Sequence, residues 1–211
     1  MDKTFWLQKW EKNEIAFHES EANPTLVKHF NKLLMKKDAR VFVPLCGKTL
    51  DIAWLVSHGY HVAGAELSEL AIKQLFANLD VTPKISKLGD IFCYSAEQIE
   101  IFVGNIFDLT PDLLGRVDAI YDRAALVALP KEMRHQYTKH LMQLTDHAPQ
   151  LLITYAYDQN QMSGPPFSVT NDEVALHYGD CYNVTLLANT AISGGLKGCP
   201  AKENVWLMGK K

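Results

Sequence analysis

Cysteine, excess basic charge and long apolar runs are all scarce in this sequence of 211 residues. Lysine plus arginine number 21 against 24 aspartate plus glutamate, for a formal net charge of -3, so the chain lacks the basic surface that nucleic-acid binding needs. No apolar run approaches the roughly 18 residues of a membrane span, and charges interrupt the N-terminus where a secretory signal has its apolar core. We therefore expect a cytoplasmic protein whose partner is a small molecule.

The cysteines and histidines indicate no metal site. The four cysteines form no CxxC pair and have no histidine at zinc-ligand spacing; they are Cys46, Cys93, Cys181 and Cys199. His135 and His140 lie off one helical face, and neither a GxSxG nor an HExxH motif occurs. We expect reduced thiols, no metal and no catalytic residue that spacing alone identifies. Two interpretations of Cys46 stay open, a reactive thiol or a small buried hydrophobe.

Short apolar runs alternate with helical patterns, which is typical of a parallel α/β sheet. Residues 40–44 and 61–65 have the composition of buried strands, and apolar residues recur at helical spacing between Thr49 and Gly59. Ser68 is placed to cap the next helix. Further strands are expected at residues 100–104, 117–121 and 150–155.

The end of the chain has a different pattern. A helix is expected to begin near Pro130, and residues 183–190 and 204–208 then flank a glycine-rich turn with no helical pattern between them. An antiparallel closing pair of strands is the expected result. Because no linker or repeat divides the chain, we expect one domain over residues 1–211.

The N-terminal segment allows two interpretations. Aromatic and apolar residues at 5–17 stand among charges, and an apolar stripe at helical spacing follows Pro24 over residues 26–34. These side chains either pack against the sheet, as most such residues do, or form a flap over a ligand site.

Glu66 is the strongest single candidate for ligand binding. It ends the second predicted strand, about 20 residues after the glycine turn at Gly47, and ligands of open parallel sheets bind at the carboxyl ends of the strands. A carboxylate there is placed to accept hydrogen bonds from both hydroxyls of a ribose. The alternative is a solvated loop acid.

The glycine turn resembles a phosphate-binding loop only superficially. Gly47, Lys48 and Thr49 imitate the end of GxxxxGK[ST], but Phe42 stands where the first glycine is required. A nucleoside triphosphatase is therefore disfavoured.

The next two predicted strands also end in polar residues. Ile106 is placed to lie against an adenine face, with the Asn105 amide or a nearby backbone group at its edge. Asp122 and Arg123 either form a surface ion pair, or Arg123 grips a ligand carboxylate in a bidentate manner. Together these residues predict a nucleoside-like cofactor.

Several strings then resemble the thiopurine S-methyltransferase family in order and spacing, over nearly the whole chain. They are residues 6–10 (WLQKW), 16–18 (AFH), 43–48 (VPLCGK), 64–68 (GAELS), 106–109 (IFDL), 121–128 (YDRAALVA) and 164–167 (GPPF). The resemblance implies a class I methyltransferase fold, which is Rossmann-like, with a seven-stranded, mostly parallel sheet, an antiparallel last strand and helices on both faces. It also implies S-adenosylmethionine as methyl donor and S-adenosylhomocysteine as product.

The resemblance assigns roles to individual residues. The cofactor contacts that it implies are Trp10, Leu45, Glu66, Asn105, Ile106 and Arg123. Phe17 matches a position that touches the methyl acceptor, and residues 1–35 are expected to form a flap and a helix over the cofactor site.

The expected acceptor is an aromatic or heterocyclic thiol, including thiopurines such as 6-mercaptopurine. One departure from animal members of the family leaves alternatives open, because residues 192–199 contain no arginine and offer only Lys197. Selenium or tellurium species, halides or another small nucleophile are alternative acceptors, and a binding module that uses the cofactor as a signal is the rival from another class. No heptad pattern demands a partner subunit, so we expect a monomer.

Overall fold

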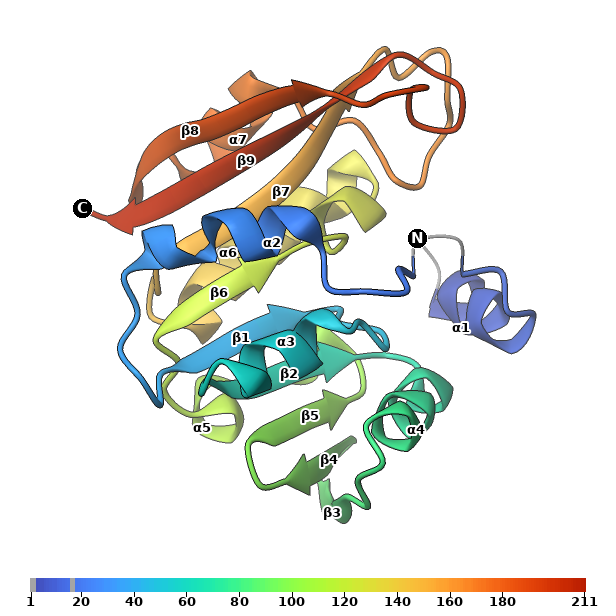
Figure 1. Cartoon of the computed structure of the whole chain (residues 1–211), viewed down its shortest axis with the longest axis vertical. Helices are drawn as coiled ribbons and strands as arrows, with labels where there is room; N and C mark the ends of the chain where they lie inside the picture. Colours follow the sequence, from blue (N-terminus) through green and yellow to red (C-terminus); the bar gives the residue numbers. More distant parts are fainter. Residues whose placement is uncertain (1–2, 16–17) are drawn as a thin grey trace. The chain divides into compact units, whose positions relative to one another are not determined.

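The computed structural model describes residues 3–15 and 18–211, and the chain divides into two compact units, Met1–Ala119 and Ile120–Lys211 (Figure 1). Each unit contains its own strands and helices, and each is described below by itself. Phe17, the predicted acceptor contact, lies outside the described residues.

The first unit is built on five strands in the order β3-β4-β5-β2-β1. They are β1 (Arg40–Pro44), β2 (His61–Glu66), β3 (Lys84–Leu88), β4 (Ile91–Ala96) and β5 (Ile99–Val103). β1, β2 and β5 are mutually parallel, whereas β4 is antiparallel to both β3 and β5. The parallel strands are apolar and almost wholly buried, as expected for strands covered on both faces.

Three α-helices of the first unit begin at a capping side chain, that of Asn23, Ser68 or Thr110. The helices of this unit are α1 (Lys3–Glu11), α2 (Pro24–His29), α3 (Asp51–Ser57), α4 (Glu69–Asn78) and α5 (Pro111–Leu114), with 3-10 turns η1 (Phe30–Leu33) and η2 (Ile106–Asp108). The Ser68 side chain accepts a hydrogen bond from Ala71 N, which confirms the predicted cap of α4. α3 and α4 pack against β2, and α3 lies in front of the sheet in Figure 1.

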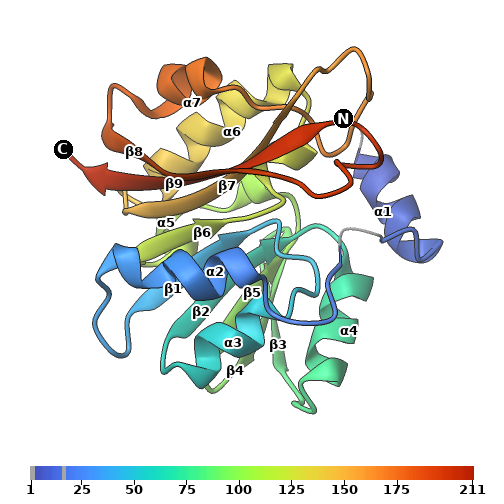
Figure 2. The same ribbon diagram turned by 45° about the horizontal axis from the view of Figure 1, so that its top comes forward.

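The second unit has four strands in the order β6-β7-β9-β8. They are β6 (Ala119–Asp122), β7 (Gln150–Tyr157), β8 (Tyr182–Ala191) and β9 (Ala201–Lys210), and the helical elements are η3 (Leu126–Ala128), α6 (Lys131–Leu144) and α7 (Asn171–Tyr178). β6 and β7 are parallel, whereas β9 is antiparallel to both of its neighbours. Figure 2 shows α6 and α7 together on one face of β7 and β9.

The α/β class, the mostly parallel strands and the antiparallel last strand are confirmed. The strand count is higher than predicted, because the described residues hold nine strands instead of seven. The sequence missed the β3–β4 hairpin, since β3 has no buried residue and therefore shows no alternation of apolar and polar positions. The prediction of one domain over residues 1–211, with residues 1–35 as a flap and helix, stays a prediction. No helix among the described residues is long and apolar enough to span a membrane.

Candidate cofactor-binding site

The turn after β1 has an unusual backbone. Leu45 and Gly47 both adopt left-handed conformations, with φ of 46° and 53° respectively. Trp10 of α1 lies directly against this turn, because a Cβ on Gly47 would be only 2.9 Å from Trp10 Cζ2. The Trp10 side chain is 5% exposed. Only glycine therefore fits at position 47 beneath this indole ring.

Glu66 ties the glycine turn to the end of β2. One carboxylate oxygen, Oε2, accepts a hydrogen bond from Gly47 N at 2.8 Å, and Oε1 accepts one from Ser68 N at 2.8 Å. Glu66 is 6% exposed, so it is no solvated loop acid. An ionised carboxylate has about four acceptor positions, so each oxygen retains capacity for one further donor.

Burial raises the pKa of the Glu66 carboxyl, while the hydrogen bonds from the Ser68 and Gly47 backbone amides act in the opposite direction. The neighbouring Cys46 is also buried, and desolvation, with the Glu66 charge as a smaller cause, raises the pKa of its thiol well above the usual value. This favours the interpretation of Cys46 as a small buried hydrophobe, since the thiolate is the reactive form.

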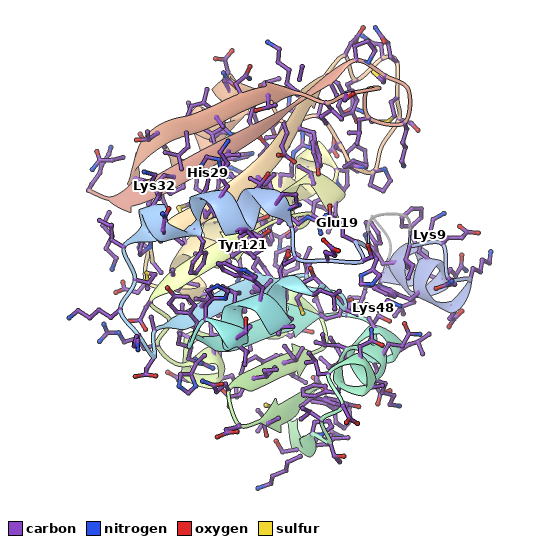
Figure 3. All side chains as sticks on the ribbon, viewed as in Figure 1. Lys9, Glu19, His29, Lys32, Lys48 and Tyr121 are labelled. Atoms are coloured by element: carbon purple, nitrogen blue, oxygen red, sulfur yellow. The ribbon has the colours of Figure 1, made fainter. Side chains whose placement is uncertain are left out.

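Lys48 does not point into a phosphate loop. Its ammonium donates to Gln74 Oε1 of α4 at 2.9 Å, and the side chain is labelled in Figure 3. Lys48 therefore links the turn after β1 to α4, whereas the lysine of a phosphate-binding loop contacts the phosphates.

The end of β5 joins the same edge of the first unit. Gly104 N donates to Glu66 O at 2.9 Å, which continues the parallel pairing of β2 and β5. Asn105 then caps η2, accepting from Phe107 N at 3.4 Å and donating to Asp108 Oδ1 at 3.3 Å. The structure therefore brings five predicted cofactor residues to the strand ends and N-terminal helix of the first unit; they are Trp10, Leu45, Glu66, Asn105 and Ile106.

Arg123, the sixth predicted cofactor residue, belongs to the second unit. It follows β6 directly, is half-buried, and has its Nε atom enclosed. The interpretation of Asp122 and Arg123 as a surface ion pair is wrong, because Asp122 is fully buried and hydrogen-bonds to Tyr137 and the Leu126 backbone instead.

The loops that follow β7 and precede β9 also lie together in the second unit. Lys197 Nζ donates to Pro165 O at 2.8 Å, which joins the glycine-rich turn to the GPPF string. Phe167 N donates to Val127 O at 2.7 Å, which joins that string to η3. The sequence predicted neither contact, because residues so distant along the chain carry no signal of their proximity.

We also searched the described residues for a cavity and for a metal-binding group. An open depression of about 750 Å³ is lined by residues 18–22 together with Pro24, Val27 and Lys28, and none of the predicted cofactor residues lines it. Across the described residues, no three His, Cys, Asp or Glu side chains are grouped so that they could hold a metal ion.

The chain is similar to known proteins over nearly its whole length. Residues 1–199 match a family model described as thiopurine S-methyltransferase. A thiopurine S-methyltransferase of Gluconobacter oxydans is 53% identical over 203 residues, covering 96% of this chain and 92% of that protein. One from Xanthobacter autotrophicus is 53% identical over 210 residues, covering 99% of each.

Solved structures support the fold. A SAM-dependent methyltransferase from Anabaena variabilis has a TM-score of 0.66 at 14% identity, covering 99% of this chain and 95% of that one. A 1,6-didemethyltoxoflavin-N1-methyltransferase of Burkholderia thailandensis has a TM-score of 0.67 at 14% identity, covering 99% and 87% respectively. At this level of identity the likeness confirms the methyltransferase fold alone.

Proposed function

Because the chain belongs to the thiopurine S-methyltransferase family and is an S-adenosylmethionine-dependent methyltransferase, we propose that it methylates the sulfur of aromatic or heterocyclic thiols, with thiopurines such as 6-mercaptopurine as acceptors. The observation that carries the proposal is the buried Glu66 carboxylate, which two backbone amides hold at the end of β2. Its remaining acceptor positions suit the two hydroxyls of the cofactor ribose.

The other residues suit the remaining parts of the cofactor. In our proposal Ile106 lies against the adenine, and the segment at Asn105 reads its edge. Trp10, whose ring contacts Gly47, closes over the methionine part, and Leu45 contacts the cofactor from the glycine turn. Arg123 holds the carboxylate of the methionine part, because a planar guanidinium binds a carboxylate through two parallel hydrogen bonds.

Bound S-adenosylmethionine supplies a methyl group that its sulfonium sulfur already activates. The protein residues then have to hold donor and acceptor in line and exclude water. Such positioning lowers a barrier by about 7 to 11 kcal/mol, which explains why no strong base or nucleophile stands out in the sequence. We propose that Phe17 contacts the acceptor.

The direct test is methyl transfer from labelled S-adenosylmethionine to 6-mercaptopurine, with the product identified by mass. We expect turnover that depends on the acceptor and yields S-methylated product in equal amount to S-adenosylhomocysteine. Tight cofactor binding with no turnover on any acceptor would instead identify a binding module. That result would overturn the proposal.

A second acceptor class is favoured by one observation. The only cation in residues 192–199 is Lys197, and its ammonium donates to Pro165 O. Because this segment contains no arginine and its one cation is already hydrogen-bonded, the alternative acceptors are selenium or tellurium species, halides or another small natural nucleophile. Competition between 6-mercaptopurine and these acceptors, compared by kcat/KM, separates the two.

Replacing Arg123 by lysine tests its proposed contact. We expect S-adenosylhomocysteine to bind about tenfold more weakly, because lysine keeps the charge but loses the bidentate geometry. Calorimetry gives the affinity, and Arg116→Lys is the matched control, since Arg116 is a highly exposed arginine of the first unit. An unchanged affinity for Arg123→Lys would remove this residue from the proposed site.

We also propose that the enzyme is a cytoplasmic monomer. All four cysteines are free thiols, which suits a reducing compartment. The exposed large apolar residues stand on separate elements and include Val27, Leu34, Ile85 and Leu176. Sedimentation analysis at micromolar concentration is expected to give a single species of 23.8 kDa.

A further inference from the structure

A buried hydrogen-bond network in the second unit lies directly beside Arg123. We propose that Asp122 is a positioning residue that fixes the loop carrying Arg123, so that the guanidinium is presented to the cofactor carboxylate. The inference rests on the proposed function, because it assumes that Arg123 is a cofactor contact. Its evidence is a set of contacts that belong entirely to the second unit.

The Asp122 carboxylate holds two different elements. Its Oδ1 accepts a hydrogen bond from Leu126 N at 3.1 Å, which closes the loop of residues 122–126. Its Oδ2 accepts one from the hydroxyl of Tyr137 in α6 at 2.7 Å. Asp122 and Tyr137 are both 0% exposed. The loop is therefore bonded through one side chain to a helix in the core.

The backbone inside this loop shows why such a bond is needed. Ala124 has a φ of 61°, a left-handed conformation that costs a non-glycine residue free energy. Strained residues persist only where surrounding contacts fix them. The bond from Leu126 N to Asp122 spans Ala124 and supplies that constraint. Arg123 lies between the two ends of this constrained loop, so its direction depends on the constraint.

The helix that carries Tyr137 is itself firmly anchored. Arg134, one turn earlier on α6, makes a two-point ion pair with Glu173 of α7, with Nε to Oε1 at 2.6 Å and Nη2 to Oε2 at 3.0 Å. Arg134 also donates to Leu129 O at 3.2 Å, just after η3. Because α6 is held in this way, the Tyr137 hydroxyl that donates to Asp122 has a fixed position.

A carboxylate in this place is energetically costly. Burial raises the pKa of Asp122 to about 6, although the bonds from Leu126, Tyr137 and Ala125 oppose the rise. Tyr137 and Tyr178 are the titratable side chains whose own pKa values the Asp122 charge raises. An apolar residue would avoid the cost of burying this charge. An acid at this position, in spite of that cost, supports a role of Asp122 in orienting the loop.

The test is a double-mutant cycle read by S-adenosylhomocysteine affinity. We expect Asp122→Ala to weaken binding about tenfold, and Asp122→Asn to recover most of that loss because its side-chain oxygen still accepts from Leu126 N. In an Arg123→Ala background, Asp122→Ala should weaken binding no further, since the residue that it positions is gone. Tyr137→Phe should give a smaller loss than Asp122→Ala and should likewise add nothing in that background.

Tyr182→Phe is the matched control for Tyr137→Phe. Tyr182 is also a buried tyrosine of the second unit, but its hydroxyl donates to Ala148 O at 3.1 Å. We expect it to lower the melting temperature without changing cofactor affinity. If Asp122→Ala fails to fold, Tyr137→Phe carries the cycle, because phenylalanine keeps the ring and removes only the hydroxyl that donates to Asp122.

Two results would overturn the inference, and they differ in meaning. If the Asp122 and Tyr137 variants weaken binding equally with and without Arg123, these residues affect the site by a route that does not pass through Arg123. If Arg123→Ala leaves affinity unchanged, Arg123 is no cofactor contact and the inference falls with it. In that second case methyl transfer to 6-mercaptopurine would still establish the proposed activity.

Discussion

Glu66→Gln will weaken S-adenosylhomocysteine binding by about 10-fold to 150-fold, because a hydrogen bond to a charged group contributes about 1.5 to 3 kcal/mol. Glu66 is 6% exposed, so solvent screening reduces this effect little. The substitution removes the charge that suits the two ribose hydroxyls. It also forces a clash of donors, since the Gly47 and Ser68 amides point at different carboxylate oxygens.

That donor clash makes the prediction independent of the glutamine rotamer. In either orientation the new NH₂ group faces one of the two backbone N–H groups, so one donor loses its acceptor in a buried place. Isothermal titration calorimetry measures the affinity, and circular dichroism checks the fold. Glu69→Gln is the matched control, because that acid lies three residues further on and is largely exposed. Equal affinity for Glu66→Gln and the unmodified enzyme would show that the ribose binds elsewhere.

Alanine at position 47 will reduce cofactor affinity by about tenfold or more and will also destabilise the first unit. Two costs combine at this position. A side chain at φ +53° costs about 1 to 2 kcal/mol, and the added Cβ would lie 2.9 Å from Trp10 Cζ2, so that the indole ring has to move. Since the Gly47 amide also donates to Glu66, the shift reaches the carboxylate proposed to bind ribose.

Gly59→Ala separates the two costs. Gly59 also has a left-handed conformation, with φ of +83°, but a Cβ there would meet nothing within 4 Å. We expect this control to lose stability without losing cofactor affinity. Thermal melts and calorimetry on both variants provide the comparison. Equal effects of the two substitutions on affinity would contradict a role for the contact between Trp10 and the glycine turn.

The parallel strands were predictable because they are buried, and buried strands are rich in apolar residues. β1 was predicted at its observed bounds, residues 40–44, and β2 was one residue short. The antiparallel pair β8–β9 was predicted from the absence of a helical pattern between two apolar runs. The β3–β4 hairpin was missed, since β3 is an edge strand with no buried residue and its sequence lacks a regular hydrophobic pattern.

The sequence by itself determined the fold class, the cofactor class and the position of Glu66 at a strand end, because burial, strand period and family strings are local properties of the chain. Only the tertiary structure decided that Glu66 bonds to Gly47 and Ser68, that Trp10 covers Gly47, and that Lys197 binds Pro165 O. It also decided that Asp122 is buried against Tyr137. These contacts join residues that are mostly far apart along the chain, and their partners are chosen by three-dimensional packing and by the need of each buried polar group for a hydrogen bond.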